Sequence, residues 1–299
     1  MAHAPRLPRA FAYSPAEGLG YQPGVTRRDP SPVIEVHGVF HVWYSRATHD
    51  ASGYYASVYH ATSTDGRTGV ERGEAVGEGG RGAGDDDVVS TPTTLIADGR
   101  YHLLYTAVPE PFTNDDGGPD GTPTAIGLVS ASSPFGPWRK FAGNPILTPG
   151  PAGAFDSHRV DDACVVARDG GYWLYYKGRE RGLSPGETKM GLAIAASPTG
   201  PYVKCPRDPV LDSGHEVCVW PSSGGVAALV MAVGPQGRTV QYAEDGVRFS
   251  KVADVQPPSA PGPLRSDGYV PGRSLDLAWG LCQVHEHDRP HLVRFDVTA

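Results

Sequence analysis

The sequence predicts an all-β protein, a five-bladed β-propeller with a short N-terminal helical arm. Strand-like segments with alternating polar and apolar residues recur along the 299 residues. They form units of roughly 50–70 residues, each marked by a glycine turn, which is typical of propeller blades. The 39 glycines and 29 prolines follow no collagen period or low-complexity tract, and therefore indicate many tight turns. Five four-stranded units fit the length of the chain.

Residues 1–26 are expected to form an arm, and residues 27–299 the propeller. Residues 14–17, Ser-Pro-Ala-Glu, have an N-cap serine, an N1 proline and an N3 glutamate, which predicts a short helix with a capping box. Gly18 and Gly20 would end this helix within about two turns. The arm is too short to be a domain, so we expect it to pack on the propeller or on a second subunit.

Each unit begins with a strand, turns at a glycine and returns in an aromatic or β-branched strand. In the first unit Asp29 precedes Gly38 by nine residues, and the returning strand 39–45 follows. The same frame recurs in three further units, at Ser90 and Gly99, at Asp161 and Gly170, and at His215 and Gly224, with Glu216 one residue further on. A fifth unit is expected at residues 263–297, with strands near 274–281 and 291–297.

A third strand and a turn complete each unit. Third strands are expected at 55–62, 125–131, 189–196 and 238–243. The turn that follows reads Ser-Pro-x-Gly-Pro at 133–137 and 197–201, where proline sets φ and glycine allows a tight turn. Two inserts rich in glycine and aspartate, 73–87 and 109–122, are expected to frame a site on one face of the propeller.

Charge and hydropathy argue against several classes of partner. The net charge is −7 and there is no basic stripe, so we expect no nucleic-acid partner and no anionic membrane partner. No apolar run reaches the roughly 18–20 residues of a membrane span, and the N-terminus lacks the apolar region of a signal peptide. The four cysteines form no CxxC pair. These features predict a cytoplasmic protein with reduced thiols.

Acidic side chains stand at the start of the first strand in three units, as Asp29, Asp161 and Glu216, which follows His215. The first strand of each blade lines the central channel, so equivalent strand starts meet at one mouth of the propeller. Glycoside hydrolysis needs a proton donor and a base for water, and a third acid can tune the donor. Crowded carboxylates raise one another's pKa, which keeps one of them protonated. The alternative is that each acid is an ordinary turn or cap residue.

The segments around these acids resemble glycoside hydrolase family 117. The resemblance is carried by residues 14–21, 24–31, 158–163, 172–179 and 213–217, so it spans most of the chain. It implies a five-bladed propeller related to the family 43 and 32 glycosidases. It further implies an inverting, exo-acting enzyme that releases 3,6-anhydro-L-galactose from neoagarobiose or neoagarooligosaccharides. The resemblance also implies a homodimer formed through the N-terminal arm.

The family's catalytic roles can be carried over by motif. Asp29 is expected to be the general base that activates water. Asp161, or alternatively Asp162, is expected to orient the reacting groups or tune their pKa. Glu216 occupies the acid position, and the adjacent His215 is also a candidate proton donor. An inverting enzyme would place its base and acid about 6.5–9.5 Å apart to admit a water.

Seven further residues at or near the strand starts, or just beyond a hairpin, are candidate substrate ligands. Basic side chains could hydrogen-bond sugar hydroxyls, and a tryptophan could stack on a ring face. The candidates are Arg27, Arg28, Thr91, His158, Arg159, Lys177 and Trp220, of which Arg28 and Trp220 are favoured. The alternative is that these residues serve blade-to-blade hydrogen bonding and ordinary packing.

No metal ligand is assigned, and no cofactor is expected to be required. His285 and His287 are two residues apart, and on a strand they would share one face that could bind an ion. A polar turn before Pro290 explains them equally well. Related propellers can hold a hydrated divalent cation on the axis, so the resemblance leaves a structural cation open.

Two other functions remain compatible with the sequence. The same site could act on another sugar, such as an α-L-arabinofuranoside or a galactofuranoside. Alternatively, the propeller could bind carbohydrate without cleaving it. A WD-type scaffold is disfavoured, because the units lack its Gly-His and Trp-Asp signatures.

Overall fold

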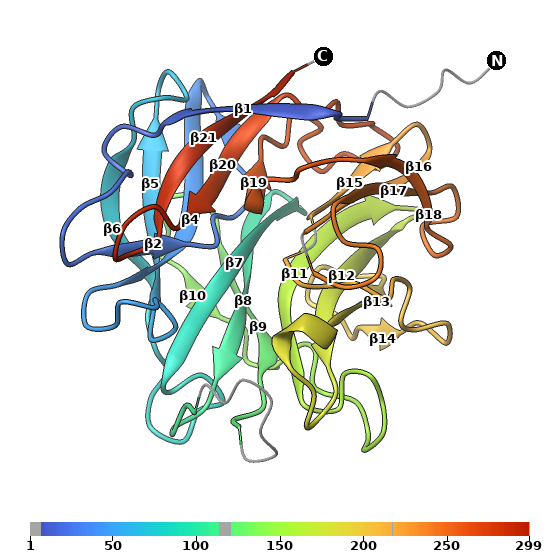
Figure 1. Ribbon diagram of the computed structural model, residues 1–299. Coiled ribbons are helices and arrows are strands. Elements are labelled where there is room, and N and C mark those ends of the chain that lie inside the picture. The colour runs from blue at the N-terminus through green and yellow to red at the C-terminus, as the bar shows by residue number, and fades with distance from the viewer. Residues whose placement is uncertain (1–6, 114–120, 217, 232, 299) are drawn as a thin grey trace.

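Five antiparallel sheets follow one another around a central axis in the computed structural model, which describes residues 7–113, 121–216, 218–231 and 233–298 (Figure 1). Each sheet is one blade of a propeller, and the order of the blades follows the sequence. The predicted all-β, five-bladed fold is therefore confirmed. Within the described ranges the chain has no helix long and apolar enough to cross a bilayer, and its helical segment is the 3₁₀ turn η1 (Pro185–Glu187).

The strands of each blade run outward from the axis in order of sequence. Blade I contains β2 (Thr26–Arg28), β3 (Ile34–Val36), β4 (Val39–Ala47), β5 (Ser57–Ser63) and β6 (Val70–Val76). Blade II contains β7 (Val88–Ala97), β8 (Arg100–Val108), β9 (Ala125–Ala131) and β10 (Arg139–Lys140). Blade III contains β11 (Arg159–Arg168), β12 (Gly171–Arg179), β13 (Lys189–Ala195) and β14 (Val203–Lys204). Blade IV contains β15 (Cys218–Ser222), β16 (Gly225–Val230), β17 (Thr239–Ala243) and β18 (Ser250–Asp254).

Blade V joins the two ends of the chain. Its strands are β19 (Ser259–Pro263), β20 (Trp279–Val284), β21 (His291–Thr298) and, outermost, β1 (Ala10–Pro15). β1 runs antiparallel to β21, from Ala10 opposite Thr298 to Pro15 opposite Val293, and lies across the top of Figure 1. This pairing closes the ring of blades.

The helix predicted at residues 14–17 is wrong, because Ser14 and Pro15 belong to strand β1. The capping pattern is a local preference, whereas β21 would otherwise leave a row of backbone groups unpaired at the sheet edge. Pairing satisfies that edge, and proline is tolerated in an outermost strand. Residues 1–6 of the predicted arm lie outside the described residues, and its role in a dimer stays a prediction.

The predicted start of the fifth blade is also wrong. The strand expected near 274–281 begins only at Trp279, and the inner strand β19 lies before the predicted unit. The sequence of β19, Ser-Ala-Pro-Gly-Pro, contains proline and glycine and gives no strand signal. Gly262 is required there, because a Cβ at this position would lie 2.1 Å from the carbonyl oxygen of Ser31 in blade I.

Buried aromatic residues of the first and second strands fill the space between blades. Trp43, Tyr105, Tyr176 and Trp220 are at most 1% exposed, although they stand on four different blades. Burial of a side chain of this size contributes about 1.5–3 kcal/mol or more. This packing holds the blades together and leaves the inner strands to shape the channel at the axis.

Candidate active site

One residue near the start of each inner strand takes a left-handed backbone conformation. These residues are Asp29 (φ 48°), Thr91 (φ 45°), Asp162 (φ 47°), Glu216 (φ 55°) and Ala260 (φ 44°), one in each blade. In three blades the pairing with the second strand shifts register beside this residue, as expected for a bulge. A left-handed non-glycine residue costs about 1–3 kcal/mol, and such residues gather at functional sites. The repeat therefore presents one left-handed position per blade, and three of the five residues there are acids.

In blade III the residue equivalent to Asp29 and Glu216 is Asp162, the alternative to Asp161 in the sequence-based prediction. Asp162 and Glu216 each precede the glycine of their hairpin by eight residues, whereas Asp29 precedes Gly38 by nine. Blade I has the extra residue because its inner strand is interrupted between Arg28 and Ile34, where two prolines stand. The nine-residue frame was thus off by one in the other blades.

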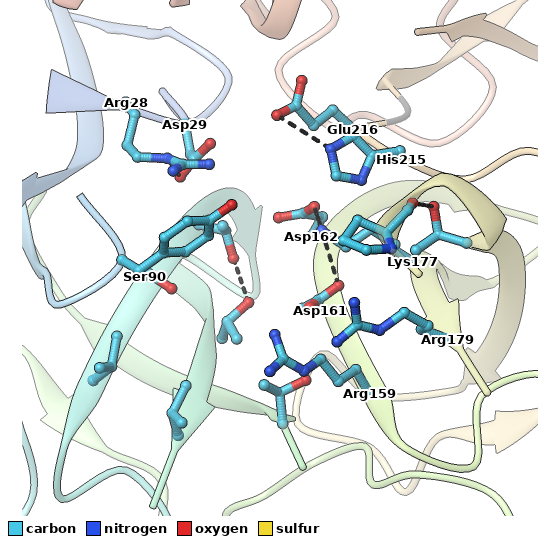
Figure 2. A pocket seen from close by; sticks show the side chains of 18 of the residues that line it. Arg28, Asp29, Ser90, Arg159, Asp161, Asp162, Lys177, Arg179, His215 and Glu216 are labelled. Carbon is cyan, nitrogen blue, oxygen red and sulfur yellow. Dashed lines mark hydrogen bonds and ion pairs between the residues drawn. The ribbon is translucent and has the colours of Figure 1, made fainter. Parts of the chain in front are cut away.

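All five predicted catalytic residues line one narrow pocket of about 80 Å³ at the mouth of the channel. They are Asp29, Asp161, Asp162, His215 and Glu216. In Figure 2, Arg28 and Asp29 face Lys177 and the two blade III aspartates across the pocket, with His215 and Glu216 at one end. Residues more than a hundred positions apart in the sequence thus meet at one point, as the repeat predicted.

Asp29 is largely buried, with 11% of its side chain exposed, and is fixed from two sides. Its Oδ2 accepts a hydrogen bond from Arg28 Nε at 2.8 Å, and its backbone N–H donates to Gln283 Oε1 at 3.0 Å. Burial raises the pKa of Asp29 and outweighs the opposing effect of Arg28, while the charges of Asp162 and Glu216 push the pKa in the same direction as burial. The carboxyl group is consequently a stronger base than a solvated aspartate.

Lys177 on β12 binds both aspartates of blade III. Its ammonium forms an ion pair with Asp162 Oδ2, and its Nζ lies 3.3 Å from Asp161 Oδ1. Burial raises the pKa of Asp161. The pKa of Asp162 is lowered although burial opposes this, because Lys177 favours the ionised form. The pKa values of the two neighbouring carboxyl groups are therefore shifted in opposite directions, and Lys177 holds Asp162 as the anion.

Glu216 accepts hydrogen bonds on both carboxylate oxygens. Oε2 receives the Ser259 hydroxyl at 3.1 Å and the Ala260 backbone N–H at 3.2 Å, and Oε1 receives Gln283 Nε2 at 3.3 Å. Blade V thus contributes no acid of its own, but holds the acid of blade IV in place.

His215 precedes Glu216, and its Nε2 lies 3.9 Å from Glu216 Oε1. Its Nδ1 is buried and has no hydrogen-bond partner among the described residues. Burial, together with the charge of Lys177, lowers the pKa of His215 to about 4. Gly214 is needed just before it, because a Cβ there would lie 2.2 Å from the backbone of Lys189.

The predicted substrate ligands divide into two groups. Arg28, Thr91, Arg159 and Lys177 line the pocket. Arg27, His158 and Trp220 do not, so the structure does not bring these three residues into the pocket. Arg27 points away to Glu71, with Nε 3.3 Å from Oε2, and His158 and Trp220 are buried, Trp220 as part of the core.

Tyr54 supplies the aromatic surface that was expected from Trp220. It stands in the loop between β4 and β5, lines the pocket and is 38% exposed, and the Arg28 guanidinium lies 4.6 Å from its ring centroid. Asp50 shapes this loop by accepting the backbone N–H groups of Ser52 and Tyr54 at 2.9 and 2.8 Å. The sequence signal for this residue is Gly53 before two tyrosines in the loop between β4 and β5.

The donor set at the axis does not fit a directly ligated cation. Asp29 is committed to Arg28, Asp162 to Lys177, and Glu216 to Ser259, Ala260 and Gln283. In the described parts of the chain no three His, Cys, Asp or Glu side chains are placed to hold a metal ion. His285 and His287 follow β20 and separate. His285 reaches Gln283, and the His287 ring packs at a tilt against Tyr21 with 4.2 Å between the ring centroids.

Comparison with known proteins gives a family. The structure superposes on a family 117 glycoside hydrolase from the marine bacterium Zobellia galactanivorans with a TM-score of 0.87 and 30% sequence identity, over 98% of this chain and 91% of that one. It shares its fold with fructan 1-exohydrolase IIa from Cichorium intybus (TM-score 0.62, 15% identity, 92% of this chain and 56% of that one). The same holds for the α-L-arabinofuranosidase from Lactobacillus brevis (TM-score 0.61, 13% identity, 94% and 93% of the two chains).

No protein-family model and no curated protein matches the sequence. The match to the Zobellia enzyme covers nearly the whole of both chains at 30% identity, and the acids of three blades converge on one pocket. The chain belongs to glycoside hydrolase family 117 and is a glycosidase built on a five-bladed propeller.

Proposed function

We propose that the protein is an inverting, exo-acting glycoside hydrolase that cleaves the α-1,3 linkage of neoagarobiose and neoagarooligosaccharides and releases 3,6-anhydro-L-galactose. The observation that carries the reaction class is the meeting in one pocket of Asp29, Asp162 and Glu216, which occupy the equivalent left-handed position of three blades. The identity of the sugar rests on the family resemblance. Exo action is supported by the narrow pocket, whose lining from several blades suits one terminal sugar ring.

Asp29 is the general base in this mechanism. Its carboxylate takes a proton from a water that attacks the anomeric carbon on the face opposite the leaving oxygen. Arg28 holds the carboxylate in one orientation through the 2.8 Å hydrogen bond. The raised pKa of Asp29 makes it a better proton acceptor in the transition state.

His215 is the better candidate for the proton donor. The Ala260 N–H and the Gln283 amide N–H both donate to the Glu216 carboxylate, so its oxygens are already occupied. The Glu216 anion then faces His215 Nε2 across 3.9 Å and stabilises an imidazolium. Nε2 is also the ring nitrogen that can donate to the leaving oxygen, because Nδ1 is buried. With the pKa of His215 lowered to about 4, this assignment predicts the highest activity under acidic conditions.

Lys177, Asp161 and Asp162 position the reacting groups. Lys177 keeps Asp162 ionised, and the negative charge of Asp162 pushes the pKa of both Asp29 and His215 upward. This makes Asp29 a stronger base and helps His215 to carry its proton. Tyr54 offers an aromatic face beside Arg28 on which the sugar ring can stack.

The reaction is tested by incubation with neoagarobiose and chromatography of the products. We expect the wild type to release anhydrogalactose and galactose, and Asp29→Asn and Glu216→Gln each to lose at least about a hundredfold in kcat/KM. Exposed Asp254→Asn and Glu35→Gln are matched controls and should remain fully active. Proton NMR of the first product formed reads the anomeric configuration, and a retained configuration would exclude inversion.

The remaining outcomes distinguish the alternatives. Turnover of nitrophenyl α-L-arabinofuranoside or galactofuranoside, without turnover of neoagarobiose, would change the assigned substrate. The assignment of the active site would remain. Fully active Asp29→Asn and Glu216→Gln enzymes would show that the site itself is misassigned. Binding of sugars with no turnover of any substrate would leave a carbohydrate-binding propeller.

A further inference from the structure

A second, wider cavity of about 380 Å³ adjoins the pocket, and we call it the outer cavity. Four residues line both spaces, namely Arg28, Tyr54, His215 and Glu216. The remaining wall of the outer cavity comes from blades IV and V and includes Arg238, Gln256, Gln283 and His285. Its volume lies within the range of about 300–1,000 Å³ that is usual for ligand sites.

The shared residues place the scissile bond between the two spaces. Asp29, Asp161, Asp162 and Lys177 line the narrow pocket, and none of them lines the outer cavity. Both candidate proton donors, His215 and Glu216, stand at the boundary. The proton donor must reach the glycosidic oxygen, which joins the cleaved sugar to the leaving group. With the cleaved sugar among the acids of the pocket, the leaving group extends into the outer cavity.

The outer cavity carries a cation that the protein does not neutralise. Arg238 is exposed, and its guanidinium makes no ion pair and no side-chain hydrogen bond with any described residue. Its backbone is nevertheless fixed in a left-handed conformation (φ 60°), with its N–H donating to the Val230 and Met231 carbonyls at 3.1 and 2.9 Å.

The rest of the outer-cavity wall contributes little negative charge to oppose an anion beside Arg238. Glu216 is the only acid that lines the outer cavity in the described part of the chain, and it is occupied by Ser259, Ala260 and Gln283. His285 and Gln256 add a titratable ring and an amide to the wall. An oxyanion brought beside Arg238 would therefore meet no unpaired carboxylate.

We propose that the outer cavity binds the leaving-group sugar and that Arg238 selects a leaving group that bears an oxyanion, either a sulfate ester or a carboxylate. This inference rests on the proposed hydrolysis and adds to it a preference for oligosaccharides whose leaving-group sugar is acidic. The planar guanidinium fork suits both oxyanions, because each can accept two parallel N–H hydrogen bonds. Arg238 is in this view a specificity residue and takes no part in the chemical step.

The first test measures binding alone, so that it does not depend on turnover. Galactose, galactose 6-sulfate and galacturonate are titrated into the wild type, Arg238→Gln and the control Arg207→Gln, an exposed arginine in a blade III turn that lines neither space. We expect one or both charged sugars to bind the wild type about 10- to 100-fold more tightly than galactose. The preference should vanish in Arg238→Gln, persist in Arg207→Gln and weaken with salt. The two charged probes distinguish sulfate from carboxylate.

Equal binding of all three sugars by the wild type, or an undiminished preference in Arg238→Gln, would overturn the inference. The second test compares kcat/KM for neoagarobiose with and without a sulfate on its galactose. The sulfated substrate should be favoured by the wild type but not by Arg238→Gln, with the rate on the neutral substrate unchanged. If the charged sugars bind through Arg238 but no disaccharide is cleaved, the proposed hydrolysis is contradicted, whereas the anion-binding role of Arg238 in the outer cavity is supported.

Discussion

Asp29 and Glu216 are joined by a single side chain, that of Gln283. Its Oε1 accepts the Asp29 backbone N–H at 3.0 Å, and its Nε2 donates to Glu216 Oε1 at 3.3 Å. Gln283 stands on β20 of blade V and is 3% exposed. Blade V, which has no acid at the left-handed position, therefore links the acid of blade I to the acid of blade IV.

Gln283→Leu should lower kcat about tenfold or more, with a smaller change in KM. The substitution leaves the Asp29 N–H and one bond of Glu216 unsatisfied in a buried setting, which costs about 1–3 kcal/mol and frees both groups to shift. Steady-state kinetics and thermal unfolding are measured together. Gln241→Leu is the control, a buried glutamine on β17 that donates to Thr239 at 2.8 Å, and should lose stability but not kcat. Equal kinetic effects of the two substitutions would contradict the role of Gln283.

Asp162→Asn should reduce kcat/KM at least a hundredfold, and Asp161→Asn only about tenfold. The charge of Asp162 acts on the pKa of both Asp29 and His215, whereas Asp161 chiefly faces Lys177. Asparagine tolerates the left-handed backbone at position 162, so the change removes the charge and keeps the bulge. Steady-state kinetics of both variants on neoagarobiose test this order. A larger loss of kcat/KM for Asp161→Asn than for Asp162→Asn would contradict it.

The architecture could be predicted from the sequence because the hairpins carry recognisable local sequence signals. Left-handed pairs such as His37-Gly38 and Asp169-Gly170 close the turn between the first two strands, and aromatic strands follow them. These signals are local, so they gave five blades and brought the acids together. The position of the acid within the bulge was not local. It depended on the interruption of the inner strand in blade I. Pro30 and Pro32 indicate this interruption but not how many residues it adds, so the spacing favoured Asp161 over Asp162.

The errors arose where long-range pairing overrides local preference. Ser14 and Pro15 belong to a strand because β21, at the far end of the chain, offers an unpaired edge. Trp220 lies on an inner strand of the same kind as the acids, but its side chain points into the core instead of the channel. Tyr54 was missed because its place above Arg28 depends on the turn around Asp50 and Gly53 in an insert without a repeat partner.

Lys177→Met should move the pH profile of kcat/KM to higher pH. The Lys177 ammonium favours the ionised form of Asp162 and the neutral form of His215. Without it the pKa of each group rises, so the carboxylate forms at a higher pH and the imidazolium persists to a higher pH. The profile is measured from about pH 4 to pH 8, with exposed Lys251→Met as the control. A profile that stays in place or moves to lower pH would contradict the coupling.

Asp208→Asn should raise the melting temperature at pH 7 by about 2–4 °C. In blade III the Tyr176 hydroxyl lies 2.9 Å from Asp156 Oδ2 and 3.2 Å from Asp208 Oδ2, although it has one proton to donate. Burial, followed by the charge of Asp156, raises the pKa of Asp208 from 3.8 to about 6. An asparagine would remove one of two crowded carboxylates and could donate its amide to the tyrosine oxygen. Its carbonyl would still accept the Leu192 N–H.

The pH dependence of this gain follows from the direction of the shift. Above pH 6 Asp208 is ionised in both the folded and unfolded states, so the folded state bears the full cost of the buried charge. As the pH falls from about 6 toward 3.8, the folded state binds the proton first and the cost disappears. The advantage of Asp208→Asn should therefore be greatest above pH 6 and shrink toward pH 4, which melting curves across this range would show.

Blade II provides the reciprocal experiment. Tyr105 donates to Asp85 at 2.6 Å, and Asn144 holds the place of Asp208, its Oδ1 accepting the Leu128 N–H at 2.9 Å and its Nδ2 donating to Tyr105 at 3.3 Å. Asn144→Asp should therefore reproduce the blade III arrangement, with a lower melting temperature at pH 7 and a smaller loss near pH 4. If Asn144→Asp were neutral, or if Asp208→Asn destabilised the protein at pH 7, the paired carboxylates of blade III would have to be a net source of stability instead of a cost.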